Sequence, residues 1–300
     1  MIGIICKDEL AADCPSLFYN FRLGLQNYLD TEFKNIECKD DLHNIDILII
    51  VDEHNIPHVD VWKNDEFIAR LNELNIKTLV FNFEKILSNI FPWNQDHQNV
   101  LETIKNLHQL VSDVDDRDHA RTFQISNNKA VTVVPHINKQ LLSKDTKLEC
   151  DLTEKKDRIL FIGQSDSTYH PNWSYSRRFN ILNELKARDD LPLDIHITGR
   201  KMPYKEYLTK LASYKFILNP LGTGDFINMR FYEALKLGCV PIQQVTGKMI
   251  SVYSELSQNI CTTFKTADEV QLPNETDSFN DFTYYLEDYF KDIDLGNYLH

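Results

Sequence analysis

The chain has 300 residues, of which 42% are hydrophobic and 26% are charged. This length suits two domains, since single hydrophobic cores stop growing at roughly 250–300 residues, and it excludes a peptide hormone or a disulfide knot. The formal net charge of −13 disfavours nucleic acid as a partner, because an acidic surface repels a phosphate backbone. An anionic small molecule remains compatible, since a few arginines in a cleft outweigh the global field locally.

Cysteine spacing and apolar run length predict a cytoplasmic protein with neither a metal cluster nor a membrane span. The six cysteines are scattered, with no CxxC pair and no His/Cys spacing suited to a metal, so we expect reduced thiols. Acidic residues occur within the first ten positions, unlike in a secretory or transit peptide. The longest clean apolar run, Ile47–Val51, is far too short to cross a bilayer.

Short apolar runs rich in β-branched residues alternate with segments of helical period in the first half of the chain. This alternation is typical of an α/β layer with a parallel sheet. We expect strands at 2–6, 44–51, 77–81, 107–112 and 130–134, and helices at 16–29, 65–74 and 99–106. Together they predict a Rossmann-like domain over residues 1–138.

Residues 139–157 are polar and lysine-rich without a convincing period, and we interpret them as a linker. The same alternation then resumes and predicts a second Rossmann-like domain over 158–275. We expect strands at 158–162, 193–197, 215–218 and 239–243, and helices at 174–188, 204–213 and 228–237.

The predicted fold class is therefore α/β, with two Rossmann-like parallel-sheet domains that face each other across a cleft. The tail, 276–300, contains an aromatic amphipathic pattern over 277–294. We expect it to form a helix that packs back across the cleft.

Ligands of open parallel sheets bind beyond the carboxyl ends of the strands, where helix N-termini present free N–H groups. The sharpest cluster there is the loop with Gly222 and Gly224, followed by the helix with Arg230 and Glu233. A cation in the first helical turn opposes the helix dipole, which favours a role in holding an anion. A carboxylate one turn further on can accept two hydroxyl groups. Two simpler interpretations stay open: Arg230 and Glu233 form a surface ion pair, and the glycines only turn the chain.

Two segments of the second half carry a family resemblance. Arg230-Phe-Tyr-Glu-Ala-Leu235, followed by Gly238-Cys-Val-Pro-Ile242, resembles the nucleotide-binding signature of exostosin-like and related GT-B glycosyltransferases. In the same families a strand ending in Phe-x-Gly, here Phe161-Ile-Gly163, precedes an arginine-rich helix, here Ser176-Arg-Arg-Phe179. The resemblance covers residues 158–243.

The resemblance implies a site for a nucleoside diphosphate sugar. Glu233 would bind the ribose, and Arg230 with the helix start at Asn228 would neutralise the diphosphate. Further expected members of the site are the basic residues Arg200 and Lys205, the segment Gly163, Gln164 and Ser165, and the loop glycines Gly222 and Gly224. The family implies no cofactor and no metal, because the helix end and basic side chains stabilise the departing diphosphate.

An inverting reaction also needs a general base that takes the proton of the acceptor hydroxyl. Asp8 follows the first predicted strand, and Glu53 and His54 follow the strongest one, so all three are candidates. Residues in such positions are also common as helix caps. The acidic cluster of Asp113, Asp115 and Asp116 favours a solvated helix start over a metal site, because no partner ligand is spaced suitably.

The leading functional hypothesis is a hexosyl- or pentosyltransferase that moves a sugar from a UDP- or GDP-sugar to a glycan or another hydroxyl acceptor. Two alternatives remain. A nucleotide-sugar epimerase would change the donor without an acceptor. A non-catalytic sugar-nucleotide or partner-binding protein would bind the donor without turnover. A dehydrogenase is disfavoured because no GxGxxG follows either opening strand.

Overall fold

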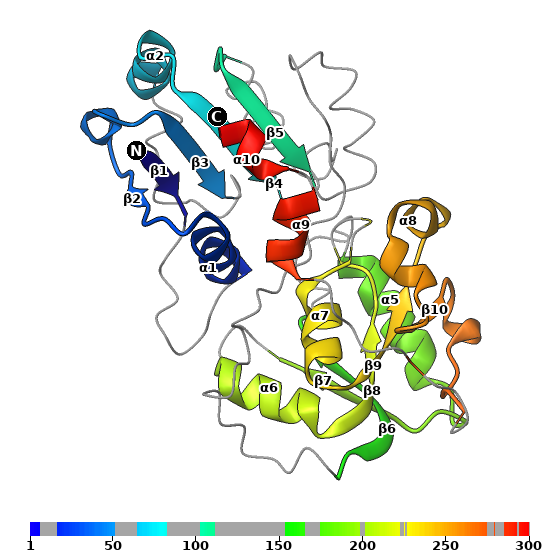
Figure 1. The fold of residues 1–300 in the computed structure, drawn as a ribbon. Helices are drawn as coiled ribbons and strands as arrows, with labels where there is room; N and C mark the ends of the chain where they lie inside the picture. The colour runs from blue at the N-terminus through cyan, green and yellow to red at the C-terminus, as the bar shows by residue number, and fades with distance from the viewer. Residues whose placement is uncertain are drawn as a thin grey trace. The chain divides into compact units, whose positions relative to one another are not determined.

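A computed structural model shows two parallel sheets with helices packed against them (Figure 1). The structure describes residues 1–6, 17–51, 65–82, 103–111, 154–165, 175–198, 202–222, 225, 227–274, 279, 285–292 and 294–299. The chain divides into two compact units, the first formed by Met1–Ala11, Pro15–Val134 and Leu286–His300, the second by Ala12–Cys14 and Pro135–Tyr285.

The first unit contains a five-stranded parallel sheet with the strand order β2-β1-β3-β4-β5. Its strands are β1 (Ile2–Ile5), β2 (Lys34–Asn35), β3 (Ile47–Val51), β4 (Lys77–Asn82) and β5 (Leu107–Val111). β3 lies in the middle, in register with β1 at Ile4↔Ile49, and all five of its side chains are buried. A central strand covered on both faces needs such an unbroken apolar run.

Within the described ranges, the helices of the first unit are α1 (Leu17–Leu29), α2 (Asp65–Glu73), the C-terminal α9 (Leu286–Asp292) and the short α10 (Leu295–Leu299). α2 buries Phe67, Ile68 and Leu71 on one face. α9 packs against α1, where the Phe290 and Phe21 rings meet edge to face with centroids 5.2 Å apart. The end of the chain therefore belongs to the core of the first unit.

The second unit contains a parallel sheet with the strand order β10-β9-β8-β6-β7. The strands are β6 (Lys156–Gly163), β7 (Leu193–Ile197), β8 (Tyr214–Asn219), β9 (Val240–Gln244) and β10 (Thr262–Phe264). The helices are α5 (Tyr175–Lys186), α6 (Tyr204–Ala212), α7 (Met229–Lys236) and α8 (Gly247–Val252). Short 3-10 turns among the described residues lie at Ser254–Ser257 and Ala267–Glu269 in this unit and at Lys39–Leu42 in the first unit.

The predicted α/β class with two parallel sheets is confirmed, and, apart from two helices, the predicted strands and helices in the described ranges are found within a few residues. The predicted strand at 130–134 and most of the predicted linker lie outside these ranges. The two edge strands β2 and β10 and the helix α8 were not predicted.

Two helix predictions need correction. Residues 103–106 of the expected helix at 99–106 form turns, because the Asn72 side chain engages the backbone there: its Nδ2 donates to the Thr103 carbonyl (2.9 Å) and its Oδ1 accepts from the Lys105 N–H (2.8 Å). The tail helix begins at Leu286 instead of residue 277, since Phe279 and Tyr285 lie outside it. Glu287 and Asp288 occupy its first turn, where acidic side chains complement the helix dipole.

Two further observations concern the described part of the chain. Cys6, Cys38, Cys239 and Cys261 carry reduced thiols. Among the helices in the described ranges, none combines the length and the apolar character needed to traverse a bilayer.

Candidate nucleotide-sugar site

A pocket of about 350 Å³ lies in the second unit, at the carboxyl ends of β6 and β7 and the first turns of α6 and α7. Its position is the one that parallel sheets favour for ligands. It is lined by Gly163, Gln164, Arg178, Thr198, Met202, Tyr204, Tyr207, Asn228, Met229, Arg230 and Glu233.

Asn228 begins α7 as its N-cap residue. Its backbone is extended, and its side-chain Oδ1 accepts the Arg230 N–H at 3.1 Å, which satisfies one of the unpaired donors of the first turn. The Nδ2 of the same amide is buried and makes no hydrogen bond within the described part of the chain. An acceptor in the pocket would satisfy it.

Arg230 is held over the end of β6. Its Nη1 donates to Asn219 Oδ1 at 3.1 Å, and its guanidinium carbon lies 5.0 Å from the centre of the Phe161 ring. Gly163 has a φ of +150°, and a Cβ on this residue would lie 2.2 Å from Arg230 Nη2. Glycine is therefore required at this position by both the backbone conformation and the approach of the guanidinium.

Glu233 is only 1% exposed, and both of its carboxylate oxygens accept hydrogen bonds from tyrosines. The Tyr204 hydroxyl donates to Oε1 and the Tyr207 hydroxyl to Oε2, each at 2.7 Å. Burial raises the pKa of Glu233 above its ordinary value, while the two hydroxyls and the charge of Arg230 oppose this rise. The first turn of α6 and the middle of α7 thus build one polar cluster.

A second guanidinium, that of Arg178 on α5, lies on the same pocket and is 7% exposed. Its Nη1 donates to the Gln164 carbonyl at 3.0 Å. A Cβ on Gly222 would lie 2.7 Å from Arg178 Nη2, so this glycine leaves room for the arginine. Two positive charges, Arg178 and Arg230, are therefore packed against two glycines at strand ends.

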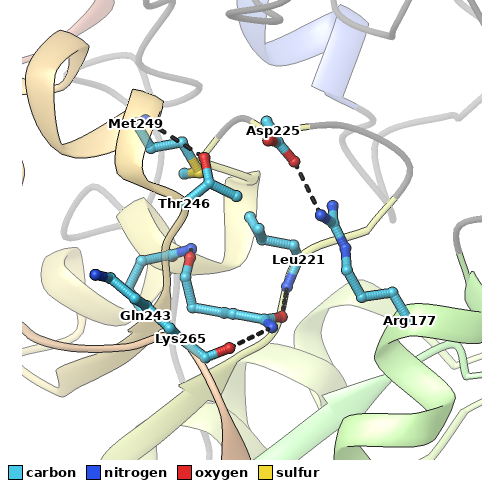
Figure 2. A network of polar contacts seen from close by, with 8 residues as sticks. Arg177, Leu221, Asp225, Gln243, Thr246, Met249 and Lys265 are labelled. Carbon is cyan, nitrogen blue, oxygen red and sulfur yellow. Dashed lines mark hydrogen bonds and ion pairs between the residues drawn. The ribbon is translucent and has the colours of Figure 1, made fainter.

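Buried amides connect Arg230 to the neighbouring strands. Asn219, which accepts from Arg230, donates through Nδ2 to Gln243 Oε1 at 2.5 Å. The next side chain, Gln244, accepts the Leu221 N–H at 3.0 Å and donates to the Lys265 carbonyl at 3.2 Å, and Figure 2 shows this bridge. These bonds tie the loops after β8 and β10 to the end of β9, which restricts the position of Arg230.

Asp225 pairs with Arg177, its Oδ1 accepting from Nη1 at 3.0 Å (Figure 2). This ion pair joins the loop before α7 to the first turns of α5. Neither residue lines the pocket.

The structure brings together five of the residues predicted for the donor site: Gly163, Gln164, Asn228, Arg230 and Glu233 line one pocket. Of the other predicted members, Gly222 contacts Arg178, Ser165 is buried outside the lining, and Lys205 is exposed on α6 and does not line the pocket. The remaining predicted residues, Arg200, Gly224, Asp8, Glu53 and His54, lie outside the described ranges.

The alternative of a surface ion pair between Arg230 and Glu233 does not describe the structure, because Glu233 is buried and accepts from tyrosines while Arg230 donates to Asn219. On α7, Tyr232 is fully buried and Leu235 is half-buried. Among the described residues, no group of three or more His, Cys, Asp or Glu side chains is arranged to hold a metal ion.

Sequence reasoning did not assign four side chains that build this site: Arg178, Tyr204, Tyr207 and Asn219. Arg178 falls in the arginine-rich segment of the family resemblance. The two tyrosines are spaced i, i+3 at the start of a helix that follows a strand, which places both hydroxyls on one face. That spacing was the available signal.

Comparisons with known proteins gave distant structural likenesses only. No family model and no curated protein matches the chain. Solved structures with a similar fold include an α,α-trehalose 6-phosphate synthase from Burkholderia multivorans, with a TM-score of 0.39 and 12% identity over 84% of this chain and 64% of that one. Another is a UDP-forming α,α-trehalose-phosphate synthase from Burkholderia vietnamiensis, with a TM-score of 0.38 and 11% identity over 84% of this chain and 67% of that one. The chain thus spans less than two thirds of the length of the first of these structures.

Proposed function

We propose that the chain is a GT-B glycosyltransferase, related to the exostosin-like enzymes, that transfers a sugar from a UDP- or GDP-sugar to a hydroxyl acceptor on a glycan or another molecule. The observation that carries this proposal is the convergence, in one pocket, of a buried carboxylate, two guanidinium groups and a capped helix N-terminus. A nucleoside diphosphate has the complementary groups: a diol and a dianionic phosphate pair.

In this proposal Glu233 binds the ribose. Each carboxylate oxygen has two acceptor positions, and the tyrosines occupy one on each, which leaves the second for a ribose hydroxyl. A buried acceptor of this kind discriminates strongly for a hydroxyl partner, because an unfilled acceptor in the closed site is costly.

The diphosphate would lie against Arg230, Arg178 and the first turn of α7. Guanidinium groups bind phosphate oxygens through paired N–H donors, and a helix N-terminus adds free backbone N–H groups. The buried Asn228 amide supplies a further donor. These groups would stabilise the negative charge that grows on the leaving diphosphate, so the proposed reaction requires no metal.

The acceptor hydroxyl needs a base, and the candidates from the first half of the chain remain Asp8, Glu53 and His54. Their replacement by Asn, Gln and Asn, respectively, tests each one through the rate of sugar transfer. The variant that lacks the base is expected to keep donor binding and lose turnover.

The first test is a thermal-shift panel of UDP, GDP, ADP and CDP, with and without divalent metal. At 100 times its dissociation constant, one ligand stabilises the folded protein by about 2.7 kcal/mol, which raises the midpoint by a few degrees. We expect one diphosphate to stabilise the protein without metal, and Glu233→Ala to abolish the shift. Glu184→Ala, which removes an exposed glutamate on α5 of the same unit, is the matched control and should keep it.

The matching nucleotide sugars then separate the functional alternatives. Release of the diphosphate that depends on an added acceptor supports transfer. A changed sugar without an acceptor indicates an epimerase, and tight binding without turnover indicates a binding protein. Absence of any shift at millimolar nucleotide contradicts the donor site itself.

A further inference from the structure

The two tyrosines beside Glu233 are arranged as a pair. Tyr204 and Tyr207 lie one turn apart on α6, with ring centroids 5.9 Å apart and planes inclined by 19°. Their hydroxyls reach different oxygens of the same carboxylate at the same distance, 2.7 Å. Tyr204 is 8% exposed and Tyr207 is half-buried, so packing restricts both rings. The pair fixes the plane of the Glu233 carboxylate.

Both hydroxyls act as donors in this arrangement. Burial, with the adjacent charge of Glu233, raises the pKa of Tyr207 well above its ordinary value, so its proton stays on at neutral pH. Glu233 must then accept, and each of its oxygens retains one free acceptor position. All three side chains line the pocket, so a ligand bound there would approach this carboxylate.

The titratable groups that line the pocket together with Glu233 come from three elements. Tyr204 and Tyr207 belong to α6, Arg230 belongs to α7, and Arg178 of α5 lies on the same pocket. The described hydrogen bonds to the carboxylate come from the tyrosines, while Arg230 donates through Nη1 to Asn219 and also hydrogen-bonds the Tyr207 hydroxyl. The orientation of the carboxylate therefore depends on the hydroxyl pair.

We propose that Tyr204 and Tyr207 are positioning residues that keep both oxygens of Glu233 directed at a vicinal diol, and that they thereby set the selectivity of the pocket for an intact ribose. This inference rests on the proposed function and deepens it. The tyrosines do not touch the reacting atoms. They act through Glu233, because their hydroxyls fix the orientation of its carboxylate and favour its ionised form.

The test compares UDP and GDP with their 2′,3′-dideoxy counterparts by titration calorimetry between pH 5.5 and 8.5. We expect the wild type to prefer the diol form, and the variant Tyr204→Phe/Tyr207→Phe to lose about ten-fold in affinity for the diol form while binding the dideoxy form almost unchanged. The loss should grow as the pH falls, because removal of the two donors raises the pKa of Glu233 further and its protonated form accepts poorly. If the tyrosines only supported folding, the variant would lose affinity equally for the diol and the dideoxy forms, and the pH dependence of binding would not change.

Tyr214→Phe is the matched control. Tyr214 is also buried and also donates to a carboxylate, Asp194 Oδ2 at 2.8 Å, at the opposite end of the same sheet. It should lower stability and leave the diol preference unchanged. The single variant Tyr207→Phe, at a half-buried position, keeps the test decisive where the double variant does not fold.

The outcomes separate the two claims. If the wild type binds none of the four probes, both the proposed function and this inference are wrong. If it binds UDP or GDP without a diol preference, or if the tyrosine variants retain both the preference and the pH profile, the inference is overturned while the nucleotide site stands.

Discussion

The two units of the chain share one architecture and differ in what they bury. Each packs helices against a five-stranded parallel sheet. Among the described residues, the first unit buries one polar side chain, that of Thr78, in its sheet. The second unit buries six: Ser165, Arg178, Asn219, Glu233, Gln243 and Gln244. The same fold thus surrounds an apolar core in one case and a polar network in the other.

The difference has an energetic cost, because a buried polar group without a partner destabilises a fold by about 1–3 kcal/mol. In the second unit several of the buried polar side chains have partners: Arg230 donates to Asn219, Asn219 to Gln243, and Gln244 bridges the backbone of two loops. In the first unit β3 needs no such arrangement, since all five of its side chains are apolar. The second sheet is therefore built around a guanidinium and a carboxylate held in fixed positions, those of Arg230 and Glu233.

The largest expected effect comes from Gly163→Ala. The new Cβ would lie 2.2 Å from Arg230 Nη2 and would hold an L-residue at a φ of +150°. Arg230 must then leave its position over Phe161, and we expect the affinity for the nucleoside diphosphate found by thermal shift to fall by ten-fold or more. Titration calorimetry measures this loss.

Gly238→Ala is the matched control, because Gly238 also has a positive φ, +66°, but no atom lies within 4 Å of the added Cβ. It should lower the free energy of unfolding by about 1 kcal/mol without changing the affinity. Equal affinity losses in the two variants would contradict the role given to Gly163.

Most of the fold was predictable from the sequence because it depends on local period. The apolar run of β3 and the i, i+3, i+4 spacing of α2 carry strong signals. The edge strands β2 and β10 were missed because two or three residues have no readable period. The helix expected at 99–106 is not formed over 103–106, where a distant side chain, Asn72, binds the backbone.

Gly163 and Arg230 were predictable from their positions after a strand. Glu233 was predictable from the family resemblance. The tyrosine pair was not predictable in the same way. Tyr204 shares its helix with the buried Leu208 and Leu211, so its spacing equals that of an ordinary core stripe. Only the fold shows that the two hydroxyls meet at a carboxylate from another helix.

The second prediction compares a buried phenylalanine in each sheet. Phe161 of β6 and Phe81 of β4 are both fully buried, and replacement of either by Leu should lower the free energy of unfolding by about 1–2 kcal/mol. Phe81 packs against Phe21 at 4.7 Å, whereas Phe161 also carries the Arg230 guanidinium on its ring. Only Phe161→Leu should therefore weaken nucleotide binding, by a few-fold, through the lost cation–π contact. Denaturant melts and titrations of both variants check this, and a similar binding loss in Phe81→Leu would argue against it.

The third prediction concerns the charge buried at Glu233. Its folded-state pKa lies above the ordinary 4.5, so its ionisation opposes folding once the pH exceeds that value. Glu233→Gln should raise the melting midpoint of the ligand-free protein by a few degrees at neutral pH, and the gain should disappear as the pH falls below about 4.5. A destabilised Glu233→Gln protein at neutral pH would mean that the tyrosines and Arg230 more than offset the burial of the carboxylate.

The smallest expected effect comes from a change at Asp194, which lies at the amino ends of the strands in the second sheet, away from the pocket. Asp194 accepts from Arg158 Nη2 at 2.7 Å and from the Tyr214 hydroxyl, and the Arg158 contact does most to lower the pKa of Asp194 from 3.8 to about 2. A lowered pKa stabilises the fold above pH 3.8, and this contribution is lost as the pH falls toward about 2. Because both side chains of the ion pair are partly exposed, we expect Asp194→Asn to cost about 1 kcal/mol at pH 7.

Urea melts of the wild type and Asp194→Asn between pH 7 and pH 2.5 measure this contribution, and the difference between the two proteins should narrow below pH 3.8. Nucleotide affinity at pH 7 should stay unchanged, because this carboxylate and the pocket lie at opposite ends of β6 and β7. In the first unit, Glu66→Gln removes the partner of Lys39 from a largely exposed ion pair. It should change the free energy of unfolding less than Asp194→Asn does. A loss of nucleotide binding in Asp194→Asn would show that the polar network of the second sheet extends from one end of the strands to the other, and that the two ends cannot be treated as independent.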